Sequence, residues 1–154
     1  MTVNPIPDGF HTLTPHLNVN DGAAAIAFYQ KAFGAEEINR HLMPDGKKIM
    51  HALLQIGSSR FMLNDEFPEM MVKGPKALGG TPVTLALYVE DVDSLFNRAV
   101  AAGATVNMPL TDMFWGDRYA QVTDPFGHKW ELCKHIEDVT PEESARRAAK
   151  LFGG

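Results

Sequence analysis

The sequence contains an internal repeat with an offset of 70 residues, and this repeat limits the folds open to the chain. An alternating segment at residues 14–19 is followed by Asp21, and an equivalent segment at residues 84–89 is followed by Asp91. Glycines in the later turns keep the same offset, and those that end the two helical patterns are 69 residues apart. Because a shared offset over such a distance indicates duplication, the 154 residues read as two copies of one supersecondary unit.

Each copy predicts a strand, a helix and three further strands. Asp21 is expected to cap the first helix, because its side chain accepts hydrogen bonds from free N–H groups of the first turn. Gly34 is expected to end that helix, because glycine enters the left-handed conformation without steric cost. The expected strands are residues 14–19, 35–43, 47–56, 60–65, 84–89, 105–110, 118–123 and 129–135.

Two segments lie outside the repeat. Residues 66–81 are rich in Pro, Gly and Met and too long for a tight turn, so they form either a linker or a flap over a site. Residues 140–152 begin with Thr-Pro-Glu-Glu, which combines a capping box with proline at the first helical position and predicts a C-terminal helix. The chain is therefore expected to be a single domain over residues 1–154, with modules at 12–65 and 82–135.

Alternation along each strand divides the side chains between two faces of the predicted sheet. Leu17 and Val19 are expected to pack under the helix, and within residues 47–56 the pattern places Met50 on this side. The opposite face then carries Thr14, His16, Asn18, His51, Leu53, Met62 and Asn64 in the first copy and Thr84, Ala86, Tyr88, Glu131, Cys133 and His135 in the second. A strand face of this mixed polarity is either a solvated surface or the wall of a ligand cavity.

Four segments carry a resemblance to a known family: residues 25–35 (AIAFYQKAFGA), 50–52 (MHA), 114–119 (FWGDRY) and 124–130 (DPFGHKW). With them the chain resembles the vicinal oxygen chelate superfamily, which includes glyoxalase I, extradiol dioxygenases and proteins of fosfomycin and bleomycin resistance. Within it, the PhnB-like branch is the most similar. The resemblance implies an α+β fold in which two tandem βαβββ modules form a cupped mixed sheet, followed by a C-terminal helix. It implies little about the reaction, because such folds host many chemistries.

The resemblance places the superfamily's metal ligands at Thr14, about Met62, Thr84 and Glu131. Only Glu131 is a good ligand, since a catalytic divalent site needs several nitrogen and carboxylate donors, and no metal cofactor is expected. The alternative is a divalent metal (Zn, Ni, Mn or Fe) held by Glu131 together with His16 and His51. Otherwise the two histidines are hydrogen-bonded residues of the cavity or core.

Other candidates also have two interpretations. Glu131 is either a general base or the ion-pair partner of Arg118. Trp115 and Arg118 form either a stacking wall with an anion clamp, or a structural turn in which Asp117 caps and Arg118 pairs internally. Cys133 reads as a small buried hydrophobic residue, and the eight methionines read as core filler, with a soft lid formed by Met70 and Met71 as the alternative for that pair. The expected groove residues are Thr14, His16, His51, Met62, Thr84, Tyr88, Trp115, Arg118 and Cys133.

Three functions fit these residues. The first is metal-free binding or sequestration of a small molecule in the groove. The second is a metal-dependent glyoxalase- or lyase-like, or dioxygenase-like, enzyme that uses Glu131 with His16 or His51. The third is a metal-free enzyme with Glu131 as general base.

The composition limits the classes of partner that the chain is expected to bind. A net charge of −5 without a cluster of Lys or Arg argues against nucleic acid and anionic membranes. One cysteine, and a start that lacks the pattern of a signal peptide, predict a cytoplasmic protein. The resemblance implies a homodimer, with the modules paired either within one chain or between two.

Overall fold

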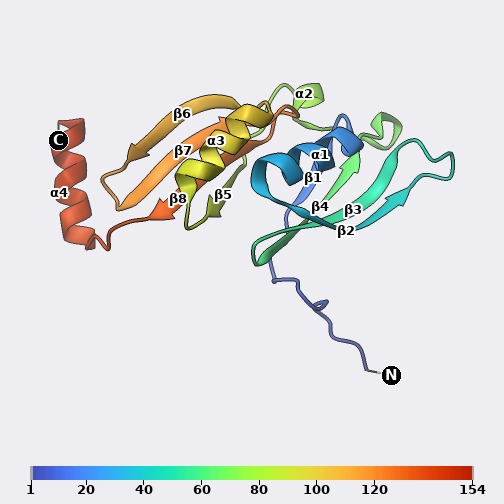
Figure 1. The fold of residues 1–154 in the computed structure, drawn as a ribbon, viewed down its shortest axis with the longest axis horizontal. Coiled ribbons are helices and arrows are strands. Elements are labelled where there is room, and N and C mark those ends of the chain that lie inside the picture. Colours follow the sequence, from blue (N-terminus) through green and yellow to red (C-terminus); the bar gives the residue numbers. More distant parts are fainter. Residues whose placement is uncertain (1, 154) are drawn as a thin grey trace.

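The computed structural model describes residues 2–153 and shows two similar modules joined by a connection with two short helices (Figure 1). The first module consists of β1 (His16–Val19), α1 (Gly22–Phe33), β2 (Glu36–Leu42), β3 (Ile49–Ile56) and β4 (Ser59–Asp65). The second consists of β5 (Thr84–Tyr88), α3 (Val92–Ala102), β6 (Thr105–Asp112), β7 (Asp117–Thr123) and β8 (Lys129–His135). The connection contains η1 (Pro68–Met70) and α2 (Pro75–Leu78), and α4 (Pro141–Phe152) follows the second module.

Each module forms its own four-stranded mixed sheet, with strand orders β1-β4-β3-β2 and β5-β8-β7-β6. The first strand of each module pairs parallel with the last, and the other neighbours are antiparallel. The prediction of an α+β fold built from two βαβββ modules and a C-terminal helix is therefore confirmed. In the part of the chain that the structure describes, no helix is long and apolar enough to cross a membrane.

Local signals fix both ends of the two main helices. The Asp21 carboxylate accepts a hydrogen bond from the backbone N–H of Ala24 at 3.1 Å, and Asp91 caps α3 in the same way through Ser94 at 3.0 Å. Gly34 ends α1 with φ 67°, a left-handed conformation that is costly for other residues. The repeat in the sequence is therefore a repeat of capping chemistry as well as of hydrophobic pattern.

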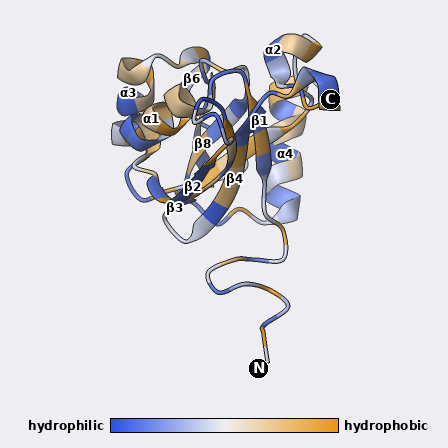
Figure 2. Ribbon diagram, turned by 90° about the vertical axis from the view of Figure 1, so that its right-hand side faces the viewer, coloured by the Kyte–Doolittle hydropathy of each residue, from blue (hydrophilic) through white to orange (hydrophobic). Residues whose placement is uncertain are grey.

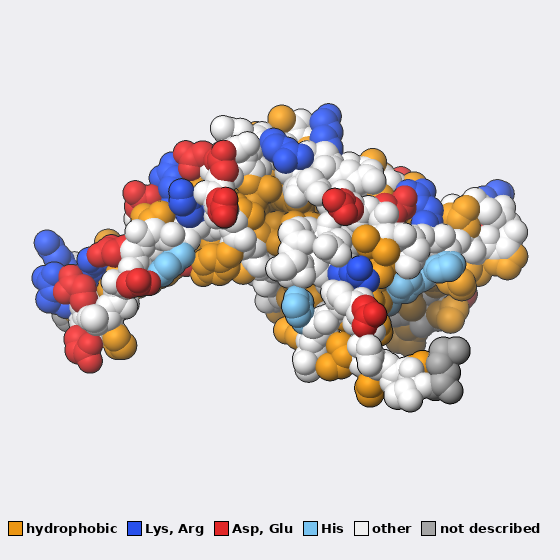
Figure 3. Space-filling model, turned by 60° about the horizontal axis from the view of Figure 1, so that its bottom comes forward, with side chains coloured by type: hydrophobic (Ala, Val, Ile, Leu, Met, Phe, Trp, Pro, Cys, Tyr) orange, Lys and Arg blue, Asp and Glu red, His pale blue; other side chains and the backbone are white. Residues whose placement is uncertain are grey.

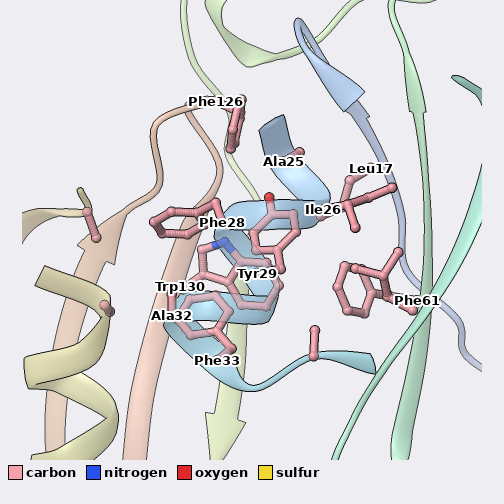
Figure 4. Close-up of a cluster of buried hydrophobic side chains, with 14 of the residues drawn as sticks. Leu17, Ala25, Ile26, Phe28, Tyr29, Ala32, Phe33, Phe61, Phe126 and Trp130 are labelled. Carbon is pink, nitrogen blue, oxygen red and sulfur yellow. The ribbon is translucent and has the colours of Figure 1, made fainter. Parts of the chain in front are cut away.

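The helices bring the two modules together. Figure 2 shows α1 and α3 on the same side of the molecule, where they contact each other. Trp130 of β8 reaches across the junction into the aromatic residues of the first module (Figure 4). Its ring centroid lies 4.9 Å from that of Phe33, 5.4 Å from Tyr29 and 6.0 Å from Phe61. The helix-facing side chains of both modules consequently merge into one hydrophobic core.

A buried carboxylate anchors this junction. Asp124, which is 4% exposed, accepts hydrogen bonds from the Tyr29 hydroxyl at 2.5 Å and the Trp130 indole N–H at 2.9 Å. Its other oxygen accepts from the backbone N–H groups of Phe126 at 2.9 Å and His128 at 3.0 Å. Burial and then the Asp124 charge raise the pKa of Tyr29 well above its usual value, so the hydroxyl stays protonated and donates.

Two side chains of β3 differ from the alternation expected at residues 47–56. Met50 was expected under the helix but is 52% exposed, and Ile49 is buried in its place at 1%. The pairing of β2 with β3 shifts register between His41 and Leu42, and such a bulge reverses the faces of the residues beyond it. Leu53 is only 5% exposed, so the face that α1 leaves uncovered is partly shielded from water.

We predict that Tyr29→Phe lowers the free energy of unfolding by about 1–3 kcal/mol, because Asp124 loses a donor that water cannot replace at this depth. Urea denaturation followed by circular dichroism measures the change. Tyr119→Phe provides the comparison, since its carboxylate partner Glu131 is half-exposed and regains water, and it should cost less. A Tyr29→Phe protein as stable as the parent would show that the junction does not depend on this bond.

Candidate functional site

The helices cover one face of each sheet, since α1 contacts β2, β3 and β4 and α3 contacts β6, β7 and β8. The opposite faces are the candidate sites. On the first sheet a cavity of about 410 Å³, called here the module 1 groove, is lined by His16, Asn18, Met43, Met50, Asn64, Phe67, Met70 and Val72. On the second sheet, the uncovered side, called the module 2 face, carries Thr84, Ala86, Tyr88, Tyr119, Gln121, Glu131 and Cys133. Figure 3 shows histidine and hydrophobic side chains next to one another on the side of the molecule that it presents.

A buried amide orients His16 in the module 1 groove. Asn64, 7% exposed, uses its side-chain NH₂ group to donate to Asn18 Oδ1 at 3.0 Å and to the backbone oxygen of Asp65 at 2.9 Å. Its Oδ1 then accepts a hydrogen bond from His16 Nε2. Because an amide oxygen only accepts, His16 carries a proton on Nε2 in this bond, and Nδ1 is the ring nitrogen left to bind other groups.

Two further histidines lie beside His16. The ring centroid of His51 is 5.8 Å from that of His16 in an edge-to-face arrangement and 6.5 Å from that of His41. Burial, followed by the charges of His16 and His41, lowers the pKa of His51. The His51 ring is therefore held neutral at neutral pH.

A second buried carboxylate orders one end of the module 2 face. Asp117, 4% exposed, accepts from the Tyr88 hydroxyl at 2.7 Å, the Trp115 indole at 3.1 Å and His135 Nδ1 at 2.9 Å. Burial alone would raise the pKa of Asp117, but these three bonds hold it below its usual value. The bond to Asp117 in turn raises the pKa of Tyr88 to about 12. Tyr88 is 63% exposed, so Asp117 fixes an aromatic ring that is open to a ligand.

Glu131 lies in the middle of the module 2 face. The Tyr119 hydroxyl donates to its Oε1 at 3.1 Å, and within residues 2–153 Glu131 forms no ion pair. Burial, and then the charges of Glu131 and Asp117, raise the pKa of Cys133 to about 11. Cys133 is thus a buried neutral thiol rather than an activated nucleophile.

The structure separates Arg118 from the other expected groove residues. Its guanidinium binds Asp93 of α3 at 2.8 Å and Asp112 at 3.0 Å, on the helix-covered side of the sheet. It therefore forms an internal ion pair, not with Glu131, and is not placed to clamp an anion beside Trp115. The segment before it forms a turn in which the Gly116 N–H donates to the Met113 oxygen at 3.1 Å, and Asp117 accepts from the Trp115 indole rather than from the turn backbone.

The residues at the superfamily's ligand positions do not form a divalent-metal site. Thr14 is half-buried and donates to the backbone oxygen of His11 at 3.1 Å, and Thr84 is half-buried at the start of β5. In the strand register His16 lies opposite Met62, and Ala86 lies opposite Glu131. These strand pairs therefore offer at most one strong donor in each module, and a divalent cation that needs several does not fit there.

The alternative metal set is also not assembled within one chain. His16 and His51 lie on the first sheet, whereas Glu131 lies on the second. Among residues 2–153, no three or more His, Cys, Asp or Glu side chains are grouped so that they can hold a metal ion. The groove residues thus divide into a histidine group on one module and a Tyr-Glu-Cys group on the other.

Sequence reasoning missed the residues that order these groups. Asn64 was expected on the open face, but its role as the amide that fixes His16 depends on contacts between three strands. Tyr119 and the hub role of Asp117 were missed for the same reason. The methionines gave a usable signal: a Met-Met pair in a proline- and glycine-rich connection, residues 66–81, is an unusual place for core filler.

Comparison with known proteins assigns the family. The model of the Glyoxalase/Bleomycin resistance protein/Dioxygenase superfamily matches residues 9–132, and the chain belongs to this superfamily. An uncharacterized protein of Mycobacterium bovis is 49% identical over 146 residues, which cover 93% of each chain. The crystal structure of TioX from Micromonospora sp. ML1 has 31% identity and a TM-score of 0.65, and covers 82% of this chain and 99% of that one. A PhnB protein from Bacillus cereus shares the fold at 19% identity with a TM-score of 0.63, over 80% of this chain and 99% of that one.

We predict that His135 titrates above its ordinary pKa of 6.5, because its ring donates to Asp138 and to Asp117. A raised folded-state pKa means that the stabilisation is complete below the unfolded value and is lost as pH rises through the folded value. An NMR titration of the His135 ring protons measures this pKa. Asp138→Asn should lower it, whereas Asp93→Asn on the helix-covered side should not, and an unchanged pKa in Asp138→Asn would contradict the assignment.

Proposed function

We propose that this chain binds an organic small molecule on the open faces of its sheets and does so without a divalent metal. One observation carries the proposal: three of the four ligand positions of the superfamily hold Thr14, Met62 and Thr84, none of which provides a strong donor for a divalent ion. Glu131, the fourth, receives a hydrogen bond from Tyr119 instead.

The surfaces beside those positions support ligand binding. Tyr88 and Trp115 present aromatic surface while their polar ends are held by Asp117, so little side-chain entropy is lost when a ligand stacks on them. The module 1 groove adds exposed methionine surface, which adapts to ligands of different shape. An apolar wall with a few fixed polar groups is the usual composition of a small-molecule site.

Metal analysis and ligand capture test this proposal together. Protein purified without chelators should contain Zn, Ni, Mn and Fe far below one equivalent, and native mass spectrometry should detect an organic adduct from the host or from an added compound library. Tyr88→Ala should weaken adduct formation, and Glu142→Gln on α4 should not. One equivalent of a divalent metal that is lost in Glu131→Ala would overturn the proposal and favour the enzyme that uses Glu131 with His16 or His51.

The metal-free enzyme remains the second candidate, because Glu131 is a carboxylate without a cation partner among the described residues and half-open to solvent. It would act as general base on a bound molecule. Turnover that survives chelation and disappears in Glu131→Gln would identify this function. If the parent chain and Glu131→Gln both release the bound molecule unchanged, the function is binding without catalysis.

We further propose that the protein is a cytoplasmic homodimer. The cytoplasmic location is proposed because the single cysteine, Cys133, is free, as is usual in a reducing compartment. The dimer is supported by α4, which lies beyond the second module and has no buried residue (Figure 1). Leu151 is 65% exposed and Phe152 75%, while Arg147 ties the helix to Glu137 at 2.7 Å. A helix fixed in place with apolar side chains in water is suited to cover a second copy.

Light scattering of the full chain is predicted to give twice the monomer mass of 17.0 kDa. Leu151→Glu combined with Phe152→Glu should shift the protein toward monomer, because it places charge in an interface that excludes water. Ala145→Glu combined with Ala149→Glu on α4 provides a matched change of two charges at exposed positions. A monomer mass for the parent chain would exclude the dimer.

A further inference from the structure

The methionines of this protein lie outside its core. None of those in residues 2–153 belongs to the buried hydrophobic set, and Met50 and Met70 are 52% and 70% exposed. The expectation that they fill the core is therefore wrong. Three of them, Met43, Met50 and Met70, line the module 1 groove together with His16.

These side chains come from three separate parts of the module. Met43 lies in the β2–β3 turn, where its N–H donates to the Lys48 oxygen at 2.8 Å. Met50 lies on β3 at the register shift, and Met70 ends η1, where its N–H donates to the Phe67 oxygen at 2.9 Å. The backbone at these methionines is thus fixed, while three rotatable bonds in each side chain allow the sulfur atoms to converge.

His16 supplies a nitrogen donor to the same cavity. Asn64 holds the Nε2 proton of its ring, which leaves the Nδ1 lone pair free to bind. A hydrogen bond from the non-ligating nitrogen to an oxygen acceptor is the usual way in which proteins orient a metal-binding histidine. The Asn64 amide is itself fixed by two acceptors, so the orientation is built into the sheet.

The lining residues also determine the kind of ion. The module 1 groove contains no Asp, Glu, Lys or Arg. The amide oxygens of Asn18 and Asn64 already accept hydrogen bonds, from Asn64 and His16 respectively. The remaining side-chain donors are thioether sulfurs and an imidazole nitrogen. Calcium and magnesium require oxygen ligands, and a divalent charge is poorly compensated by a neutral set. Thioethers with imidazole select the soft, monovalent Cu(I) ion.

We propose that Met43, Met50, Met70 and His16 form a binding site for one Cu(I) ion. This site goes beyond the small-molecule function proposed above and lies away from Thr84 and Glu131 of the superfamily's metal positions. It requires no change of oxidation state, since the ion is bound as Cu(I).

Competition with a chromogenic Cu(I) chelator tests the site on the full chain, under anaerobic conditions and with Cu(I) as the only added metal. The protein should withdraw one equivalent from the chelator. Met50→Leu and Met43→Leu should each weaken binding by about tenfold or more, which corresponds to about 1.4 kcal/mol. The double variant should withdraw none, and X-ray absorption of the parent complex should show sulfur and nitrogen neighbours.

The controls separate this site from the other soft donors. Met108→Leu on β6 and Cys133→Ser remove a thioether and the only thiol from the second module, and neither should change the affinity. Leucine retains the size of methionine, and an unchanged melting temperature verifies that each variant is folded. Failure to withdraw Cu(I), loss of binding in Cys133→Ser, or full binding in the Met43→Leu/Met50→Leu protein would each overturn the proposal. None of these results depends on the organic ligand or on Glu131.

Discussion

The Asp124 carboxylate holds the two halves of this protein in their arrangement. It is buried and saturated by four donors, one from α1 of the first module and three from the second. A buried carboxylate is costly unless its oxygens are paired, so the first module cannot leave the junction without exposing or orphaning it. Trp130 packs against Tyr29 and Phe33 at the same junction. The junction therefore combines buried apolar surface with hydrogen bonds that fix the orientation of the two modules.

This junction explains why the candidate sites lie where they do. The helix-facing side chains meet each other at the centre of the molecule, and the opposite face of each sheet is left outward. The two outward faces differ in chemistry. The module 1 groove is neutral and rich in sulfur, whereas the module 2 face carries Glu131 with Tyr119 and Tyr88, and the charge of Glu131 contributes to raising the pKa of both tyrosines and of Cys133.

The parts of the fold that were predictable from sequence are those that depend on local chemistry. Asp21 and Gly34 delimit α1 as expected, and the strand at residues 129–135 agrees at both ends. Met50 was placed on the wrong face because a register shift between neighbouring strands leaves no mark in the alternation of one strand. Features that depend on the pairing of segments far apart in the sequence could not be predicted from the pattern of a single strand.

The candidate site shows the same limit more strongly. Alternation brought His16, Tyr88 and Glu131 to open faces, but the hydrogen-bond partners that define them come from other strands. Asn64 determines which nitrogen of His16 is free. It does so because its own NH₂ group donates to Asn18 and Asp65, and no local sequence pattern predicts these two bonds. Arg118 illustrates the reverse case, because a side chain that reads as an anion clamp is neutralised by Asp93 from a helix that the strand pattern does not place beside it.

Divergence of the open faces carries little penalty for the fold. Thr14, Met62 and Thr84 are only half-buried, whereas stability depends on Tyr29, Trp130 and the other buried residues of the core. Substitution of a metal ligand on an open face leaves the core and the Asp124 junction unchanged. A duplicated βαβββ unit can therefore exchange one binding chemistry for another, and the histidine that remains opposite Met62 becomes available to a different set of donors.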